Sequence, residues 1–308
     1  MSPDRQRGAA ARVQSALGCS GRAVSRWLGF CRGTLRYRPK PVPERKQRLE
    51  AEIVKLSKAY PTFGYKKIAA KLREAGWPVG KKLVQRVRRE ECLQVPPPKA
   101  RTRRQGLSTG LPQQARRKNH VWAWDFMSDY TQRGGKLRVF NLVDEFTREC
   151  HCIHADRAIK AKDVLRALQE AIARHGPPAY IRSDNGPEFI AKAIQKWLHA
   201  HRIKTIYIDP GCPWQNGFAE SFNSRFRAEC LDRELLYTLR ESRVVFADWR
   251  EHYNHERPHR SLGLQTPHAF AQTLNQRGLG SGRPPGSLRQ ALVPNQNTEQ
   301  PKPPGNSH

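Results

Sequence analysis

Residues 121–126 form the short apolar run Val121-Trp122-Ala123-Trp124-Asp125-Phe126, which contains a single carboxylate. Apolar and aromatic runs of this length, bounded by turn residues, are typical of buried strands. The pair Gly134-Gly135 predicts a hairpin turn into a second apolar strand at residues 139–143, and residues 150–154 predict a third. This part of the chain is therefore expected to begin as β-structure.

Helices and strands alternate after the third predicted strand. The pattern predicts a helix over residues 161–175, a strand over 179–182 that ends at Ser183-Asp184, and a helix opened by Pro187. A fifth strand is expected at residues 205–208, followed by a loop and a helix that carries Glu220. Three strands followed by alternating helices and strands predict an α/β fold, a mixed sheet with helices on its faces.

The charge of the chain is concentrated in its first part. The 308 residues include 56 Lys and Arg against 27 Asp and Glu, a formal net charge of +29. Residues 1–120 hold 30 basic and 7 acidic side chains, an excess of 23, whereas the rest of the chain has an excess of only 6. Such a segment predicts a polyanionic partner, because neutralising phosphates releases condensed counterions. A solubilising tail is the alternative, and the helical patterns in this segment speak against it.

The hydropathy pattern contains no membrane or secretory signal. No apolar run reaches about 18 residues, the length of a membrane-spanning helix, and the N-terminus lacks the apolar core of a signal peptide. We therefore expect a cytoplasmic protein. Its seven cysteines are scattered, which does not indicate a disulfide framework. Cys150-His151-Cys152 with His154 could be a metal cluster, but buried thiols on a strand are the favoured interpretation.

Two helical units are predicted in the basic part. Residues 20–37, within an N-terminal region 1–43, have a helix-turn-helix pattern. A second unit, residues 44–94, predicts helices at 46–60, at 65–75 and after the turn at 76–80. In its last helix Leu83, Val84 and Val87 face inward, which leaves outside Lys81, Lys82, Gln85, Arg86, Arg88 and Arg89. We predict DNA contacts from Lys81, Lys82, Gln85, Arg86 and Arg89; a solvated helical surface is the alternative.

The remaining boundaries follow from composition. Residues 95–119 hold seven basic and no acidic side chains together with several prolines, which predicts a basic linker. The α/β core with a helical C-terminal extension is expected over residues 120–275. Residues 276–308 are rich in Gly, Pro, Ser, Asn and Gln, and we expect them to be disordered.

Three acids occupy informative positions in the core. Asp125 lies in the first strand, Asp184 follows another strand, and Glu220 lies on a helix. On that helix Phe218, Phe222 and Phe226 predict a buried stripe, which places Glu220 on the far side, on a face shared by Asn216, Asn223 and Arg227. Converging carboxylates suit Mg²⁺ or Mn²⁺, and a pair of such ions can activate the attacking oxygen and stabilise the leaving oxygen at phosphorus. Taken singly, the three acids could end a strand, form an Asx turn and be a solvated helix residue.

Thirty-five residues separate Asp184 from Glu220. With this spacing, the sequence resembles the DDE transposase and retroviral integrase superfamily, and within it the downstream-frame product of bacterial insertion-sequence transposases of the IS-three family. The resemblance covers about residues 20–270. The matching stretches are Trp124-Asp125-Phe126, residues 143–150, Ser183 to Phe189, Asn216-Gly217, Glu220 to Asn223, Tyr253 to Gly263, and the residues around Phe63-Gly64-Tyr65 and Ala75-Gly76-Trp77.

The resemblance implies a ribonuclease-H-like catalytic core in which Asp125, Asp184 and Glu220 bind two Mg²⁺ ions, with Mn²⁺ able to substitute. It implies that water first cuts a phosphodiester at an element end and that the exposed 3′-OH then attacks another phosphodiester, with no protein nucleophile or ATP. Asp129, Asp144 and Glu188 are interpreted as structural or supporting acids.

The resemblance also implies the partners. They are the DNA of the element ends and target, and further copies of the chain on that DNA. Because no sustained heptad repeat is present, an upstream-frame protein with a helix-turn-helix and zipper is a further expected partner. We predict core DNA contacts from Trp214, Asn216, Arg225 and Arg227, with Trp214 as a plain loop hydrophobe the alternative. For Tyr253 to Gly263 we expect a packing or DNA-contact role.

Two other functions fit the same residues. One is a ribonuclease-H-like metal-dependent nuclease that does not transfer strands. The other is a catalytically inactive DNA-binding regulator.

Overall fold

The computed structural model describes residues 2–38, 43–96, 114–183, 186, 191–209 and 213–276, without the side chains of residues 213, 214 and 275. The chain forms two compact units, residues 1–52 and 53–308, and the division falls inside helix α4 (Glu44–Ala59). Asp184, Glu188, most of the predicted linker and nearly all of the predicted disordered tail lie outside the described residues. No helix in the described part of the chain is both long and apolar enough to cross a membrane.

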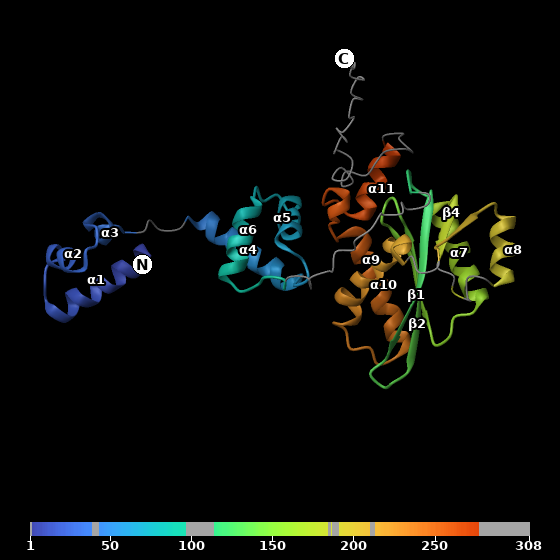
Figure 1. Ribbon diagram of the computed structural model, residues 1–308, viewed down its shortest axis with the longest axis horizontal. Helices are drawn as coiled ribbons and strands as arrows, with labels where there is room; N and C mark the ends of the chain where they lie inside the picture. Colours follow the sequence, from blue (N-terminus) through green and yellow to red (C-terminus); the bar gives the residue numbers. More distant parts are fainter. Residues whose placement is uncertain are drawn as a thin grey trace, which may run out of the picture. The chain divides into compact units, whose positions relative to one another are not determined.

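The first unit contains three helices before α4 (Figure 1). Helices α2 (Gly21–Leu28) and α3 (Arg32–Arg36) confirm the two helices predicted within residues 20–37, and Gly29 ends α2 with a φ of +66°. Helix α1 (Pro3–Leu17) was not predicted. Its boundaries nevertheless have local causes, since the Ser2 hydroxyl accepts a hydrogen bond from the Arg5 backbone and Gly18 adopts the left-handed conformation.

Helix α4, α5 (Tyr65–Glu74) and α6 (Lys81–Glu90) confirm the three helices of the second predicted unit. Arg88 corrects one prediction, because its side chain is 2% exposed and does not face outward. Arg88 lies one turn after the buried Val84, on the inner face of α6. Its guanidinium donates hydrogen bonds to the carbonyl oxygens of Phe63 and Leu93, which ties α6 to the loop before α5 and to the chain just after α6.

The second compact unit, residues 53–308, also contains a five-stranded sheet in the order β3-β2-β1-β4-β5. Strands β1 (Val121–Tyr130), β2 (Lys136–Asp144) and β3 (Cys150–Asp156) are antiparallel, whereas β1, β4 (Tyr180–Ser183) and β5 (Lys204–Tyr207) are parallel. Helix α7 (Ala161–His175) lies between β3 and β4, and α8 (Lys192–Ala200) lies between β4 and β5. This arrangement confirms the predicted ribonuclease-H-like mixed sheet.

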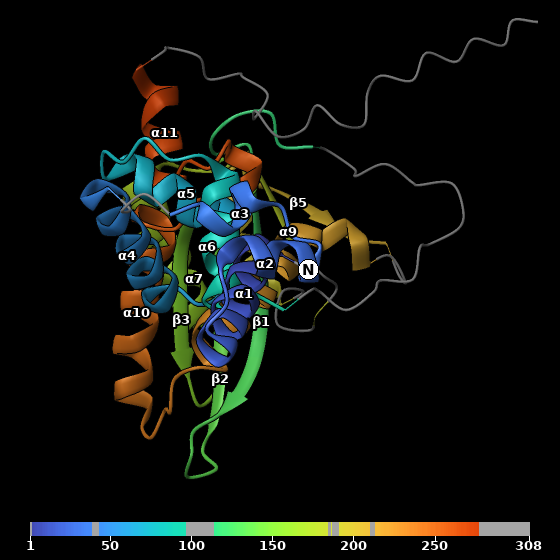
Figure 2. The same cartoon turned by 90° about the vertical axis from the view of Figure 1, so that its left-hand side faces the viewer.

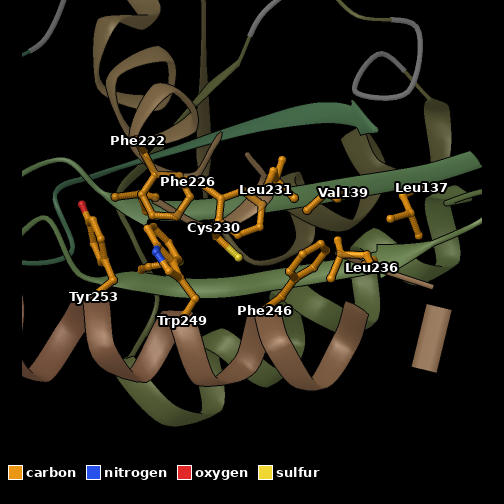
Figure 3. Close-up of a cluster of buried hydrophobic side chains, with 13 residues drawn as sticks. Leu137, Val139, Phe222, Phe226, Cys230, Leu231, Leu236, Phe246, Trp249 and Tyr253 are labelled. Atoms are coloured by element: carbon orange, nitrogen blue, oxygen red, sulfur yellow. The ribbon is translucent and has the colours of Figure 1, made fainter. Parts of the chain in front are cut away.

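Helices cover both faces of the sheet (Figure 1). Trp122 and Trp124 of β1 are fully buried in the cluster formed with α7 and α8. The opposite face packs against α9 (Gly217–Phe226) and α10 (Leu239–His255), and Figure 3 shows its aromatic core. Helix α10 runs along β3 (Figure 2). Because successive side chains of a strand alternate between faces, Asp125 points to the side covered by α9.

The Tyr253 to Gly263 motif packs the last described part of the chain against the core domain. Tyr253 belongs to the aromatic core, and the Asn254 amide makes two 2.9 Å hydrogen bonds with the backbone of Cys150 at the start of β3. At the end of the 3₁₀ turn Arg260–Leu262, Leu262 packs with Phe146 and with Phe270 of α11 (Pro267–Gln276). The packing part of the predicted role is therefore confirmed.

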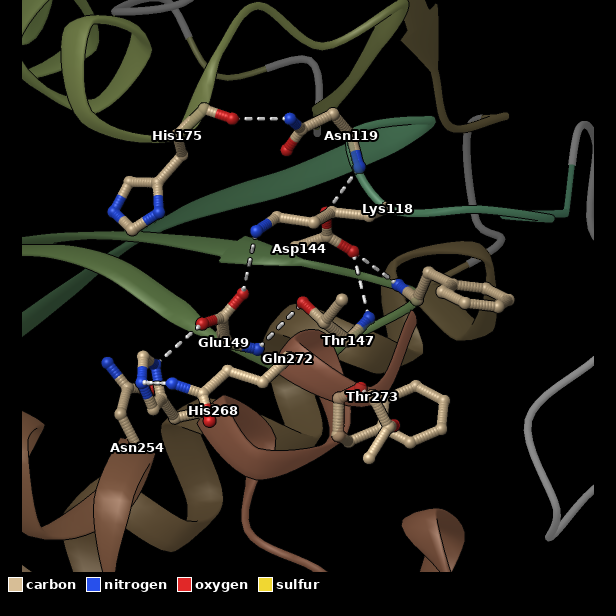
Figure 4. Close-up of polar contacts among 12 residues, drawn as sticks. Lys118, Asn119, Asp144, Thr147, Glu149, His175, Asn254, His268, Gln272 and Thr273 are labelled. Atoms are coloured by element: carbon tan, nitrogen blue, oxygen red, sulfur yellow. Dashed lines mark hydrogen bonds and ion pairs between the residues drawn. The ribbon is translucent and has the colours of Figure 1, made fainter. Parts of the chain in front are cut away.

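Asp144 organises the turn after β2 (Figure 4). Its carboxylate accepts hydrogen bonds from the backbone nitrogens of Asn119 at 2.7 Å, Phe146 at 2.7 Å and Thr147 at 3.0 Å. The contact with Asn119 also fixes the chain just before β1. These bonds confirm that Asp144 is a structural acid.

Candidate active site

The sheet and α9 meet at the side chain of Asp125. Asn141 of β2 is its register partner across the antiparallel pair, so both side chains emerge on the α9 face. The amide nitrogen of Asn223 donates a 2.8 Å hydrogen bond to Oδ2 of Asp125, and its amide oxygen accepts one of 2.8 Å from Nδ2 of Asn141. The backbone nitrogen of Phe126 donates to Oδ1 of Asp125 at 2.8 Å. The carboxylate is thus fixed from two sides.

Glu220 lies one turn before Asn223 on α9 and is exposed. Side chains three residues apart on a helix have their Cβ atoms about 5–6 Å from each other. Because Asn223 binds Asp125 directly, the turn that carries Glu220 is held beside the strand that carries Asp125. The prediction that Glu220 faces away from the core is confirmed.

The predicted phenylalanine stripe of α9 is correct in two of its three members. Phe222 and Phe226 are buried in the core, at 3% and 0% exposure. Phe218 is only partly buried and lies under the guanidinium of Arg148, whose Cζ is 4.0 Å from the ring centroid. The reason is positional, since the first turn of α9 lies against the turn after β2 and not against the sheet.

Asp184, the third predicted ligand, lies outside the described residues and follows directly on Ser183, the last residue of β4. The described end of β4 is anchored by an ion pair. Nε of Arg182 lies 2.6 Å from Oε1 of Glu145, and both side chains are fully buried. Burial raises the pKa of Glu145, even though the hydrogen bonds and charge of Arg182 oppose the shift.

The carboxylates of Asp125 and Glu220 are chemically suitable ligands for a divalent cation. Carboxylate oxygens are the ligands that Mg²⁺ prefers, and the amide of Asn223 gives Asp125 the supporting hydrogen bond typical of a metal ligand. Within the described residues, Asp125 and Glu220 are the two predicted ligands that can be placed. Asn141 was not predicted to take part. Its signal in the sequence is a single amide inside the apolar strand residues 139–143.

The predicted DNA contacts of α6 are all exposed: Lys81, Lys82, Gln85, Arg86 and Arg89. Among them, Arg86 forms an ion pair with Glu90 at 3.6 Å. The side chains on α6 therefore form a basic outer face above a buried inner one.

The predicted DNA contacts of the core lie in different surroundings. Arg225 is exposed on α9. Arg227 is exposed but donates to the Ser128 carbonyl at 3.2 Å and pairs with Asp129 at 3.6 Å. It therefore ties α9 to the end of β1. Asn216 precedes α9 and is only 4% exposed, so it does not share the solvent face of Glu220, and the Trp214 side chain lies outside the described set.

Residues 150–154 form the predicted strand. Cys150 is buried, and burial raises its pKa well above the usual range of a thiol. His151 is buried against the rings of Trp122 and His175, at centroid distances of 4.5 and 4.0 Å. Burial lowers the pKa of His151 well below its usual value, which favours the neutral ring.

Known proteins similar to this chain include two insertion-element proteins. The Integrase core domain family matches residues 115–213 and 201–267, and the HTH-like domain family matches residues 44–101. The insertion element IS476 protein of Xanthomonas euvesicatoria is 36% identical over 276 residues, covering 88% of this chain and 78% of that protein. The insertion element IS407 protein of Burkholderia multivorans is 35% identical over 261 residues, covering 84% and 93%.

A solved structure, the HTLV-2 integrase catalytic core domain in complex with magnesium, is 19% identical and covers 50% of this chain and 97% of its own, with a TM-score of 0.39. The two insertion-element proteins match at more than 30% identity over most of their length. This chain, in which an HTH-like domain precedes an integrase core domain, therefore belongs to the bacterial insertion-sequence transposases.

Proposed function

We propose that this chain is a DNA transposase that cuts the 3′ ends of an insertion sequence and joins them to target DNA. Asp125, Asp184 and Glu220 are its metal-binding carboxylates. The observation that carries the proposal is the amide of Asn223, which hydrogen-bonds to Asp125 from the turn of α9 that also carries Glu220. Asp184 joins the proposal through its spacing from Glu220 and its position directly after β4, the strand that neighbours β1.

The protein residues have a positioning task in this reaction. Two divalent cations held by the three carboxylates would supply charge neutralisation and activation of oxygen nucleophiles. Asn223 and Asn141 orient Asp125 through two successive 2.8 Å hydrogen bonds. No covalent intermediate with the protein is needed, because one phosphodiester is exchanged for another and catalysis rests on alignment and charge.

We further propose that α6 enters a DNA groove. Its exposed face carries the side chains for phosphates and base edges, while Val84 and Val87 anchor it to the helical unit. The predicted homo-oligomer on DNA and the upstream-frame partner remain part of this proposal. Arg227 and Asn216 are the weakest of the proposed DNA contacts, because the Arg227 guanidinium already contacts Ser128 and Asp129 and Asn216 is only 4% exposed.

The test uses a labelled duplex that carries the terminal repeat flanking the gene, with Mg²⁺ and a target duplex. Asp125→Asn and Glu220→Gln are each expected to lower both cleavage and joining by at least about a hundredfold, because each removes an anionic ligand. Glu234→Gln, a change at an exposed acid, is the matched control and should retain activity. Full activity of either site variant would refute the assignment, and cleavage by the wild type without joining would indicate a nuclease.

A further inference from the structure

A cavity of about 900 Å³ lies on the flank of α9 that Glu220 does not face. Its cationic side chains come from four segments of the second unit, namely α5, the turn after β2, α9 and the Tyr253 to Gly263 motif. The side chains that give it its character are Lys67, Arg148, Phe218, Arg225, Arg257 and Arg260. A volume of this size is typical of sites that enclose a ligand of nucleotide size or larger.

The cavity has an excess of positive charge. Five of its lining residues are Lys or Arg, and Glu229 is the one acid among them. Arg148 is the most unusual of these cations. Its Nε is buried and has no hydrogen-bond partner among the described residues, and its Cζ lies 4.0 Å from the centroid of the Phe218 ring. Burial lowers the pKa of Arg148, which shows how poorly its charge is solvated.

Glu229 balances only one of these cations, Arg257, which binds both of its oxygens. They accept hydrogen bonds of 2.6 Å each from Nε and Nη2 of Arg257, and Lys67 lies 3.9 Å away. Burial, and then repulsion by Arg257, lower the pKa of Lys67 to about 7, although Glu229 opposes the shift. Cations that are partly dehydrated and outnumber their counter-charges are stabilised by an added anion.

The position of the cavity relative to the candidate active site follows from the geometry of α9. Each residue of a helix is rotated by about 100° from the one before it. Around the axis of α9, from Glu220 toward the cavity, the side chains follow in the order Ser224, Ser221 and Arg225. All three are exposed. A strand with a phosphate at Asp125 and Glu220 can therefore cross two serines and place another phosphate at the cavity.

We propose that this cavity binds a backbone phosphate of the DNA strand whose neighbouring phosphodiester is cut, a role that rests on the proposed function. Arginine guanidinium groups bind phosphate oxygens in bidentate fashion, and the partly buried Phe218 offers a ring to an adjacent base. The Tyr253 to Gly263 motif supplies Arg257, His259 and Arg260 to this site, which gives it a task beyond packing. Free phosphate shares the same chemistry, so the test must separate the two ligands.

The first experiment measures binding of a fluorescein-labelled single-stranded oligonucleotide to the full chain, without divalent metal, as a function of salt. The cavity variant combines Arg225→Gln and Arg260→Gln, both exposed positions; the control combines Arg233→Gln and Arg240→Gln, also exposed. In the cavity variant, the steepness of the plot of log affinity against log salt concentration is expected to decrease by about 0.7 for each phosphate that the protein no longer neutralises. In the control variant it should not change. Equal slopes for the two variants would overturn the proposal.

Inorganic phosphate, added at constant ionic strength, distinguishes the ligands. It should weaken oligonucleotide binding by the wild type, because it competes for the cavity, and should have no such effect on the cavity variant. Equal weakening of oligonucleotide binding in both proteins would overturn the proposal. Occupation of the cavity by phosphate without any change in oligonucleotide affinity would mean that it is not a DNA subsite. Because no metal is present, these outcomes are independent of cleavage and of the proposed function's own test.

The second experiment uses the titration of Lys67. The charged or titratable groups around it are Glu229, Arg225, Arg257 and His259. Besides Lys67, only Glu229 and His259 in this group could change charge. Burial would raise the pKa of Glu229, but Arg257 lowers it below its usual value. Burial lowers the pKa of His259 well below its usual value. Lys67 alone in this group therefore changes charge near pH 7. Wild type and Lys67→Arg should bind the oligonucleotide equally below this pKa, and Lys67→Arg more tightly above it; parallel pH profiles would contradict the site.

Discussion

The ion pair of Arg182 and Glu145 provides a quantitative test of how the end of β4 is held. Both side chains are 0% exposed, and the closest N–O distance is 2.6 Å. Replacing Arg182 with Met leaves the Glu145 carboxylate buried without its partner. Removing one member of a buried pair costs about 3–5 kcal/mol, far more than the pair contributes relative to two apolar residues. We expect Arg182→Met to lose about that much stability at neutral pH.

The loss should depend on pH in a direction that the structure determines. Burial already raises the pKa of Glu145 in the folded wild type, so this group stabilises the fold most below its unfolded pKa of about 4.3. That contribution is lost as the pH rises through the higher, folded pKa. Removing Arg182 raises the folded pKa further, since the charge that opposed the shift is gone. Arg182→Met should therefore be much closer to wild type near pH 4 than at pH 7.

The assay is urea unfolding of the full chain followed by tryptophan fluorescence, since Trp122 and Trp124 are fully buried beside β4. The double variant Arg182→Met with Glu145→Met should recover most of the loss, because no charge is left buried. Arg243→Met breaks a half-exposed 2.8 Å pair with Asp156 and a 2.9 Å hydrogen bond to the Ala155 carbonyl, and should cost only about 1–2 kcal/mol. The reasoning is refuted if Arg182→Met costs no more than Arg243→Met, or if the double variant is as unstable as the single one.

Three further predictions concern single sites. Asn223→Ala should lower Mg²⁺-dependent cleavage by about 10–100-fold and shift the Mg²⁺ titration to higher concentrations, because Asp125 loses its orienting amide; an unchanged titration would contradict this role. Arg88→Met should destabilise the second helical unit by about 1.5–3 kcal/mol, measured by hydrogen exchange of α6 amides, because two buried carbonyls lose a charged donor. Arg89→Gln in α6 should reduce the salt slope of duplex binding by about 0.9 if it contacts one phosphate, whereas an unchanged slope would place that side chain away from DNA.

The active-site assignment combines information of two kinds. The 35-residue spacing and the surrounding motifs identify three acids in the sequence, but spacing alone places nothing in space. The hydrogen bond between Asn223 and Asp125 supplies that placement for the described pair of elements. The functional consequence is testable through Asn223, which can be changed without removing any of the three carboxylates.

Apart from α1, the sequence by itself determined the order of the strands and of the helices up to α9, and the outward position of Glu220. These features depend on local periodicity, on turn residues such as Gly29, and on the repeat of Phe222 and Phe226, all of which act between residues close in the chain. The same local reasoning misplaced Arg88 and Phe218. Whether either side chain is buried depends on what lies opposite it, and a pattern along one helix does not contain that information.

Only the tertiary structure decided which distant residues meet. Asn141 hydrogen-bonds to Asn223, which lies 82 positions later in the sequence. Lys67 of α5 lies beside Glu229 and Arg257, which come from much later in the chain. Sheet register and the packing of α9 and α10 bring these groups together, through contacts that no local propensity encodes. The charge of the cavity beside α9 has the same origin, because its cations come from four separate segments and become a site only when the fold removes them from water together.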